Sequence, residues 1–321
     1  MIKDIYANIL GRISRYGDDI RQTSEKLRRR KIPRHLVDIT DSVPIKAHQF
    51  DIQSLFSTNL FMGLYDEQQI MEKLEQVGII DIIQKKGFRN ILVSIDKQDS
   101  YTSRLYVNCG AIEENRRLIE LIVREGVFVP RQNFIPAYDF TGGLRILLIE
   151  WLCLQNPRAE FTPDKPRLPG QEHPGLGTLK NMQEFLYKLA KHSGKDAIVD
   201  VPEYFHSAVI YSGLYSRIYS RAYSFFSPVD AGIMQAMQRD ITELPLADIS
   251  FAIASDCLVN AGTGEPVNWQ PSEQIYSLSE KLTNYLEDDR YKEIVIATMN
   301  DHSFSINREK YERLKEKDLL Q

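Results

Sequence analysis

The run Leu144-Arg-Ile-Leu-Leu-Ile-Glu-Trp-Leu-Cys-Leu154 constrains the fold more than any other segment of the chain. Its apolar residues occupy both alternating faces, as in a strand that is covered on both sides of its sheet. After Arg145, only Glu150 interrupts the apolar residues. The run is too short to cross a bilayer, so we expect a central strand and no membrane span.

Strand-like and helical segments alternate on both sides of this run. The hydrophobic spacing predicts strands at 90–96, 103–109, 144–154 and 197–201, and helices at 113–125, 178–192 and from 203 to about 225. This order predicts a mixed α/β (α+β) fold, in which helices cover a central sheet.

Both flanks of the predicted core are mainly helical in pattern. Residues 66–85 carry apolar residues at helical spacing, with Asp66 as the expected N-cap and Gly87 as the stop. After residue 228, the pattern predicts helices at 228–239, 277–286 and 308–317 and a strand at 294–299. We therefore divide the chain into a helical segment (1–88), an α/β core (89–228) and a helix-rich extension (229–321).

Composition narrows the class of protein. The chain has 321 residues, 43% of them hydrophobic, which is enough for a sizeable core. A net charge of -4 provides no general attraction to nucleic acid, so we expect no nucleic-acid partner. Three widely separated cysteines argue against a disulfide scaffold and favour a reducing cytoplasm. The first residues lack the apolar segment of a secretory signal.

Several common catalytic motifs are missing from the sequence. The chain contains no Walker A loop, GxSxG, HExxH or GxGxxG motif. Its six histidines show no spacing typical of metal ligands. We expect no metal site.

A Pro- and Gly-rich loop, residues 167–177, separates the central strand from the next predicted helix. Gly175 and Gly177 allow backbone N–H groups to approach a ligand closely. The following helix would direct the positive end of its dipole at the same place. This arrangement suits a phosphate cradle, and the alternative is an ordinary tight turn that caps the helix.

Four tyrosines recur every fourth residue in the predicted long helix, at positions 211, 215, 219 and 223. Spacing of four puts them on one slowly rotating stripe. Such a stripe is typical of packing against another element, and it can also line a ligand groove or a subunit interface in a homo-oligomer.

Residues 144–225 resemble the core of the GNAT acyltransferase superfamily. In that family, a strand ends at a loop of the form Q/R-x-x-G-x-G/A, whose N–H groups hold the pyrophosphate of acyl-coenzyme A. Here Gly175-Leu-Gly177 supplies the G-x-G, Glu172 stands at the Q/R position and Gln171 precedes it. Residues 205–211 are similar to the family's N-x-x-A-x-x-L-Y segment but one residue shorter, with Ala208 and Ile210-Tyr211 matching and Phe205 where Asn is usual.

The resemblance implies acyl-CoA as co-substrate and a set of site residues. The implied cofactor-binding residues are Leu152, Leu154, Gln171, Gly175, Leu176, Gly177 and Thr178. It also implies that Tyr211 protonates the leaving thiolate, whereas a tyrosine of this kind can equally be part of the core.

Three further side chains are candidates on chemical grounds. Glu150 can deprotonate an amine, or it can pair with Arg145 or another cation. His173 can bind phosphate or act as a base. Cys153 can be a nucleophile, but a cysteine inside an apolar strand is usually inert.

Together these features predict a cytoplasmic N-acyltransferase that moves an acyl group from a thioester to an amine by direct attack. The donor would be acyl-CoA or an acyl carrier protein, and the acceptor a small-molecule amine or a protein. Two alternatives stay open. One is a non-catalytic scaffold that assembles through the Tyr-rich helix, and the other is a different phosphate-ligand transferase, such as a nucleotidyl or phosphoryl transferase.

Overall fold

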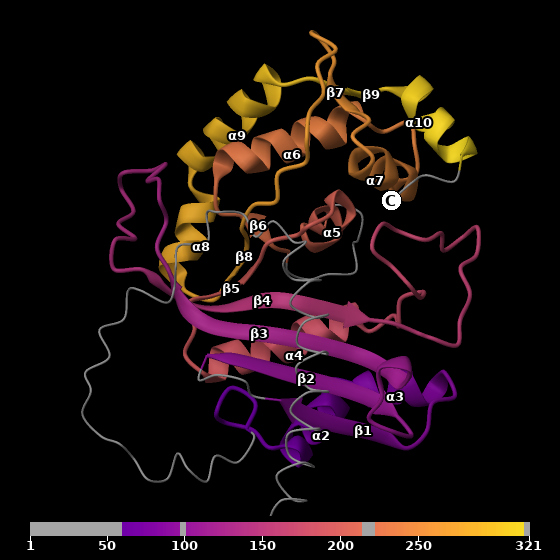
Figure 1. Ribbon diagram of the computed structural model, residues 1–321. Coiled ribbons are helices and arrows are strands. Elements are labelled where there is room, and N and C mark those ends of the chain that lie inside the picture. Colours follow the sequence, from indigo (N-terminus) through magenta and orange to yellow (C-terminus); the bar gives the residue numbers. More distant parts are fainter. Residues whose placement is uncertain (1–59, 97–100, 214–221, 318–321) are drawn as a thin grey trace, which may run out of the picture. The chain divides into compact units, whose positions relative to one another are not determined.

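The computed structural model describes residues 60–96, 101–213 and 222–317. All of them belong to one compact unit, Pro44–Gln321. The fold is mixed α/β, as the sequence predicts, with a seven-stranded sheet and helices packed against it in the described part of the chain (Figure 1).

Two short helices precede the sheet, α2 (Glu67–Gln76) and α3 (Ile79–Lys85). Asp66 caps α2 as predicted: its carboxylate accepts from the N–H of Gln69 at 2.8 Å, and the Gln69 side chain accepts from the N–H of Asp66. The single helix predicted at 66–85 is divided at Gly78. Its φ of 76° lies in the left-handed region, which interrupts a right-handed α-helix.

Four consecutive antiparallel strands follow: β1 (Ile91–Asp96), β2 (Thr102–Cys109), β3 (Arg117–Phe128) and β4 (Leu144–Leu154). The turn predicted at 97–100 lies outside the described residues. The helix predicted at 113–125 is wrong, because a 3₁₀ turn η2 (Glu114–Arg116) leads directly into strand β3. The apolar, β-branched run of β3 is instead buried between β2 and β4.

A crossover helix and a parallel strand continue the sheet. Helix α4 (Leu179–His192) leads to β5 (Ala197–Asp200), which pairs in parallel with β4. β8 (Gln274–Ser277) then pairs with β5, and β6 (Ser224–Phe225) pairs with β8. The sheet order is β1-β2-β3-β4-β5-β8-β6. The predicted C-terminal extension therefore contributes β8 to the core sheet.

The helix after β5 is much shorter than predicted. Helix α5 (Phe205–Tyr211) has Ser212 as its C-cap, and Gly213 follows with a φ of 69°. The expectation of one helix from 203 to about 225 is wrong, since the N–H of Tyr223 donates to the C=O of Tyr211 and the chain has turned back. Tyr215 and Tyr219 of the predicted stripe lie outside the described residues.

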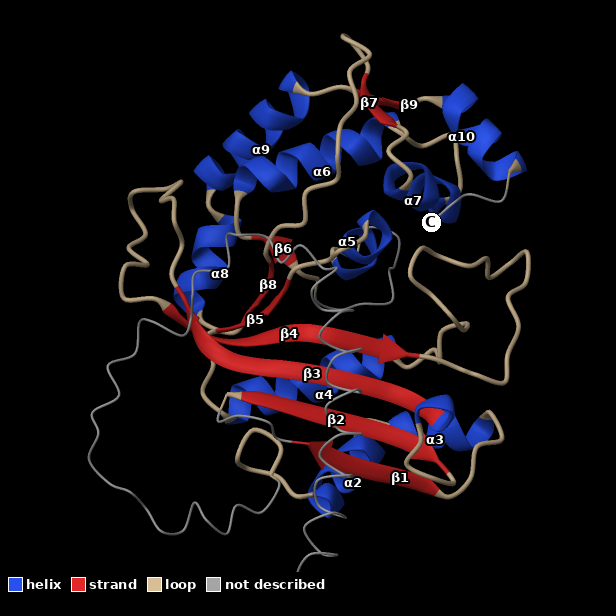
Figure 2. Cartoon of the chain, in the orientation of Figure 1, coloured by secondary structure: helices blue, strands red, loops and turns tan. Residues whose placement is uncertain are grey.

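Helices α2, α3 and α4 share one hydrophobic core with a single face of the sheet (Figure 2). Fully buried residues of this core include Leu74, Ile83, Leu105, Leu121, Leu147 and Phe185. Burying such a side chain contributes roughly 1.5–3 kcal/mol. Because α2 and α3 belong to this core, the predicted boundary at residue 88 separates no independent cores in the described part of the chain.

The C-terminal part is helical, with one small two-stranded sheet. Its elements are α6 (Pro228–Asp240), α7 (Leu246–Ala254), β7 (Leu258–Asn260), α8 (Glu280–Glu287), α9 (Asp289–Asp301), β9 (Phe304–Ile306) and α10 (Arg308–Glu316). The strand predicted at 294–299 is wrong, because these residues lie inside α9. Helices α6 and α9 pack closely at Gly232 of α6. A Cβ on Gly232 would lie 2.7 Å from the C=O of Val295 in α9, so only glycine lets these two helices approach this closely.

None of the described helices is both long enough and apolar enough to span a membrane.

Candidate functional site

Strands β4 and β5 are joined at one end and separate at the other. At the joined end, the N–H of Arg145 donates to the carboxylate of Asp196 at 2.8 Å, and the N–H of Asp196 donates to the C=O of Arg145 at 2.7 Å. Parallel pairing then runs only as far as Ile149 opposite Asp200. Beyond Ile149, β4 continues to Leu154 without β5.

The reason for the separation lies in the residues that follow β5. The N–H of Val201 donates to the carboxylate of Asp200 at 2.9 Å, so it is already used. Pro202 has no N–H to donate. The ladder therefore stops at Asp200, and among the described residues no strand continues beside the last residues of β4 on that side, which we call the open edge of β4.

The backbone groups at this open edge can be assigned from the strand geometry. The N–H of Gln155 donates to the C=O of Leu118 at 2.9 Å, so Gln155 faces β3. Because backbone groups alternate along a strand, those of Leu152 and Leu154 point away from β3, toward the open edge. The side chains of Leu152 and Leu154 pack against the core below. An N–H and a C=O of Leu152 and the N–H of Leu154 thus face the gap.

A β-bulge lies at the point where the two strands part. Ile122 of β3 is opposite Trp151, whereas Val123 is opposite Ile149, so Glu150 is the extra residue. Bulges of this kind change the direction of a strand and are common beside active sites. Here the bulge directly precedes the open edge of β4.

Glu150 pairs with Arg124 of β3, at 2.5 Å between carboxylate oxygen and Nε. Both side chains are about a quarter to a third exposed, at 24% and 33%. Of the two sequence hypotheses for Glu150, the structure therefore supports an ion pair, with Arg124 rather than Arg145 as the partner. Arg145 pairs with Asp196 instead.

The Gly-containing loop is attached to the end of β4. The N–H of Leu176 donates to the C=O of Leu154 at 3.0 Å, and the N–H of Asn156 donates to the C=O of Pro174 at 2.8 Å. The side chain of Leu176 is fully buried in the core. Leu176 therefore anchors the loop. The sequence hypothesis required its N–H to be free for a ligand, but this N–H is already used by Leu154.

Gly175 and Gly177 flank this anchor and are both exposed. Gly177 has a φ of 77°, which favours glycine, and a Cβ on Gly175 would meet nothing closer than 3.9 Å. The loop thus exposes backbone on both sides of Leu176. It leads directly into the N-terminus of α4.

The start of α4 is fixed and leaves polar groups unused. The Nδ2 of Asn181 donates to the C=O of Val77 at 2.5 Å, which ties α4 to the end of α2. Thr178 is the N-cap, but its side chain makes no capping hydrogen bond. Its Oγ1 is fully buried and has no hydrogen-bond partner in the described structure. The helix end therefore has unused donors and the positive end of a dipole.

Gln171 and His173, the other loop candidates, differ in how they are held. The Gln171 side chain accepts from the N–H of Leu168 at 3.2 Å, and its C=O accepts from Arg167 at 2.8 Å. Gln171 thus stabilises the turn around Gly170 rather than reaching toward the glycines. His173 is half-buried beside them.

Tyr211 lies at the C-terminal end of α5, and its ring contacts Tyr223 with centroids 5.6 Å apart. Tyr223 in turn contacts Tyr276 of β8. Burial and the nearby charge of Asp200 raise the pKa of Tyr223. This row of tyrosines therefore reaches the end of β5, where the gap opens.

The structure places Tyr211 and Glu150 on different faces of the sheet. Tyr211 packs against the core that α2, α3 and α4 cover. Glu150 pairs with Arg124, on the opposite face. Because the gap between β4 and β5 lies in the plane of the sheet, a group bound in it can be approached from both faces.

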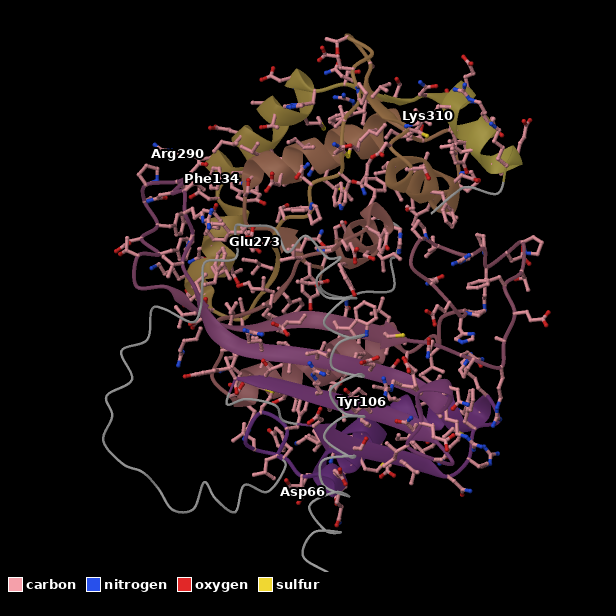
Figure 3. The ribbon with its side chains drawn as sticks, in the orientation of Figure 1. Asp66, Tyr106, Phe134, Glu273, Arg290 and Lys310 are labelled. Atoms are coloured by element: carbon pink, nitrogen blue, oxygen red, sulfur yellow. The ribbon has the colours of Figure 1, made fainter. Side chains whose placement is uncertain are left out.

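That opposite face is polar along β2 and β3. Tyr106 of β2, which Figure 3 labels, lies opposite Glu120 in the register of β2 with β3. The guanidinium of Arg117 lies 4.2 Å from the ring centroid of Tyr106, and Arg117 pairs with Glu120 at 3.2 Å. Cys153 is opposite Glu120 in the register. Burial, together with the charges of Glu120 and Glu172, raises the pKa of Cys153 to about 11. The thiol is therefore protonated at neutral pH, which supports its interpretation as an inert residue.

Sequence reasoning missed a cation beside the loop. The Cε of Lys86, which follows α3, lies 4.0 Å from the position that a Cβ on Gly177 would occupy. The only sequence signal is that Lys85 and Lys86 end a helix just before Gly87, and nothing there links them to residue 177.

Among the described residues, no group of three or more histidine, cysteine or carboxylate side chains is arranged to hold a metal ion.

Comparison with models of known protein families and with curated protein sequences finds no match to this chain.

Proposed function

We propose that this chain is an N-acyltransferase whose donor is a phosphopantetheine thioester bound at the open edge of β4. One observation carries the proposal: β4 continues past Ile149 without β5, and its last carbonyl holds a glycine loop that leads into a helix N-terminus. The arrangement combines an edge for an extended ligand with donors for its phosphate.

The pantetheine arm suits the open edge because it is extended and carries two amides. Such a ligand can add to a strand as a further strand would, through backbone hydrogen bonds. Leu152 and Leu154 supply the groups that face the gap. The phosphate then falls at the exposed glycines 175 and 177, beside the N-terminus of α4, where the helix dipole favours negative charge.

The reaction in this proposal is direct transfer. The acceptor nitrogen attacks the thioester carbonyl, a C–N bond forms, the C–S bond breaks, and the thiol is released. Glu150 takes the proton that the amine loses, and Tyr211 gives a proton to the departing thiolate. In this proposal the two residues act from the two faces of the sheet. His173 contacts the phosphate.

Two classes of donor fit this chemistry, acyl-CoA and an acyl carrier protein, and the acceptor is a small-molecule amine or a protein amine. The scaffold hypothesis rested on a long Tyr-rich helix. The described part of that segment forms only the short helix α5, so we place the acyltransferase first and keep the scaffold as the alternative.

Thermal unfolding in the presence of candidate ligands tests the proposal. Acetyl-CoA, a long-chain acyl-CoA and ATP with Mg²⁺ are compared at saturating concentration. A ligand at 100 times its dissociation constant stabilises the folded state by about 2.7 kcal/mol. We expect stabilisation by a thioester or by free CoA. Stabilisation by ATP with Mg²⁺ alone would contradict the proposal and favour phosphoryl or nucleotidyl transfer.

A matched pair of variants assigns the response to the loop. Gly175→Glu adds a negative charge beside the expected phosphate, at a position with space for a side chain. Gly142→Glu adds the same charge to another loop, where a Cβ meets nothing within 4 Å. Loss of the ligand response in the first variant alone supports the proposed cradle.

A further inference from the structure

The surface beside the glycine loop carries a group of exposed cations that the proposed reaction does not use. This basic patch consists of Lys85, Lys86, Arg89, Arg158 and Lys180. The residues come from three separate segments: the end of α3 and its continuation, the loop after β4, and the first turn of α4. The chain as a whole has a net charge of -4, so the patch does not reflect its average composition.

Hydrogen bonds and close contacts connect the end of α3 to the loops after β4 and before α4. Lys86 lies beside Gly177. Arg158 donates to the C=O of Gly87 at 3.3 Å, and its guanidinium lies 4.5 Å from the ring centroid of Phe88. Arg89, the next residue, donates to the C=O of Gln84 at 2.6 Å. Lys85, Lys86, Arg89 and Arg158 thus form one surface around the continuation of α3, and Lys180 follows Gly177 by three residues, in the first turn of α4.

The patch extends well beyond the glycine loop. Arg158 also contacts the sulfur of Cys109, the last residue of β2, and Arg89 lies two residues before the start of β1. β1, β2, β3 and β4 are consecutive neighbours in the sheet. Three interstrand steps of about 4.8 Å give roughly 14 Å between β4 and β1. A diphosphate held at Gly177 is too small to cover that width. It would leave the cations near β1 and β2 exposed.

We propose that the basic patch is the docking surface for an acidic acyl carrier protein, whose phosphopantetheine arm enters the open edge of β4. This inference rests on the proposed acyltransferase function. Charge complementarity supports this partner: an acidic protein surface can contact all five cations while its arm passes Gly177 into the gap. Such rim charges mainly increase the association rate and select the partner.

The test compares two donors in two charge-reversed variants. Lys85→Glu/Arg89→Glu reverses two cations of the patch and leaves Lys86, the cation beside Gly177, unchanged. Arg313→Glu/Lys317→Glu makes the same charge change at exposed positions at the end of α10. Each variant and the unmodified protein are assayed with acyl-carrier protein and with acyl-CoA of the same acyl chain. Lys85→Gln/Arg89→Gln serves if the reversed patch variant does not fold.

We expect reversal of the patch to lower kcat/KM with the carrier protein by roughly ten-fold or more, through KM. Transfer from acyl-CoA should change little, and the α10 variant should behave as the unmodified protein. An equal loss with both donors, or no loss with the carrier, would overturn the docking surface while the acyltransferase function stands. The absence of transfer from every thioester would instead overturn the proposed function itself.

Discussion

The backbone N–H of Leu176 donates to the C=O of Leu154 at 3.0 Å, which fastens the glycine loop to the last residue of the central strand. The two residues are separated in sequence by a long Pro-rich segment. Their contact keeps the loop at the end of the open edge, so both proposed halves of the donor site are held by one strand.

Leu176→Ala should destabilise the protein by about 2–5 kcal/mol, because the side chain is fully buried and its loss leaves a cavity. Urea unfolding measures the change. Leu64→Ala is the control, since Leu64 is 44% exposed and the substitution should cost less than about 0.5 kcal/mol. Similar values for both variants would show that Leu176 does not anchor the loop.

Gly177→Ala should cost about 1–2 kcal/mol, because the residue has a φ of 77° and an alanine is strained there. The neighbouring space is open, so strain alone causes the loss. Gly175→Ala is the matched control: its φ is not positive and the added methyl group meets no close contact. Equal free energies of unfolding for the two variants would contradict this difference.

Glu150→Gln separates the catalytic role from the ion pair. If Glu150 accepts the proton of the amine, the variant should lose roughly 10²–10⁴ in kcat. Arg124→Gln keeps the carboxylate but removes its partner, so it should reduce kcat less. If kcat is unchanged in Glu150→Gln, Glu150 is not the base and its role is limited to the ion pair with Arg124.

Tyr211→Phe should reduce kcat by roughly 10²-fold with little change in KM, because the hydroxyl would act only on the leaving thiolate. Tyr223→Phe removes the hydroxyl of its ring neighbour and keeps the packing. We expect this second variant to retain most of its turnover. A thioester donor with a more acidic leaving thiol should partly rescue Tyr211→Phe.

His206 should make the protein less stable in mild acid. Burial lowers the pKa of His206 to about 4, from an ordinary value of 6.5. Between these values the unfolded chain binds a proton that the folded protein does not, so stability falls as pH falls. From pH 7.5 to pH 5 the loss should be about 2 kcal/mol. Denaturant unfolding of His206→Gln at both pH values should lack this component, and an equal loss in the variant would rule it out.

Much of the element pattern could be predicted because it depends on local spacing. A short window of sequence shows three of these features: the apolar run of β4, the Asp66 cap of α2, and the helical spacing of apolar residues in α4. The predicted helix at 113–125 failed because a buried β-branched run has no clear period of its own, and its pairing partners decided the outcome. The Tyr-rich helix failed at Gly213, where a positive φ turns the chain.

The site depended far more on tertiary structure. Glu150 was a visible candidate, but its partner Arg124 is set by the register of β3 with β4 and by the bulge at Glu150. Leu176 was expected to donate to a ligand, yet its N–H is used by Leu154. Lys86 lies beside Gly177 only because α3 packs near the start of α4, which no sequence spacing reveals.

The sequence by itself determined that this chain builds a mixed α/β core around a central apolar strand, with a glycine loop and a helix after it. These features follow from side-chain burial and backbone freedom within short segments. Only the tertiary structure decided that β5 stops at Asp200, that β4 has an open edge, and that the loop is fastened to its end. Those relationships depend on hydrogen bonds between residues far apart in the chain, whose geometry is fixed only when the sheet assembles.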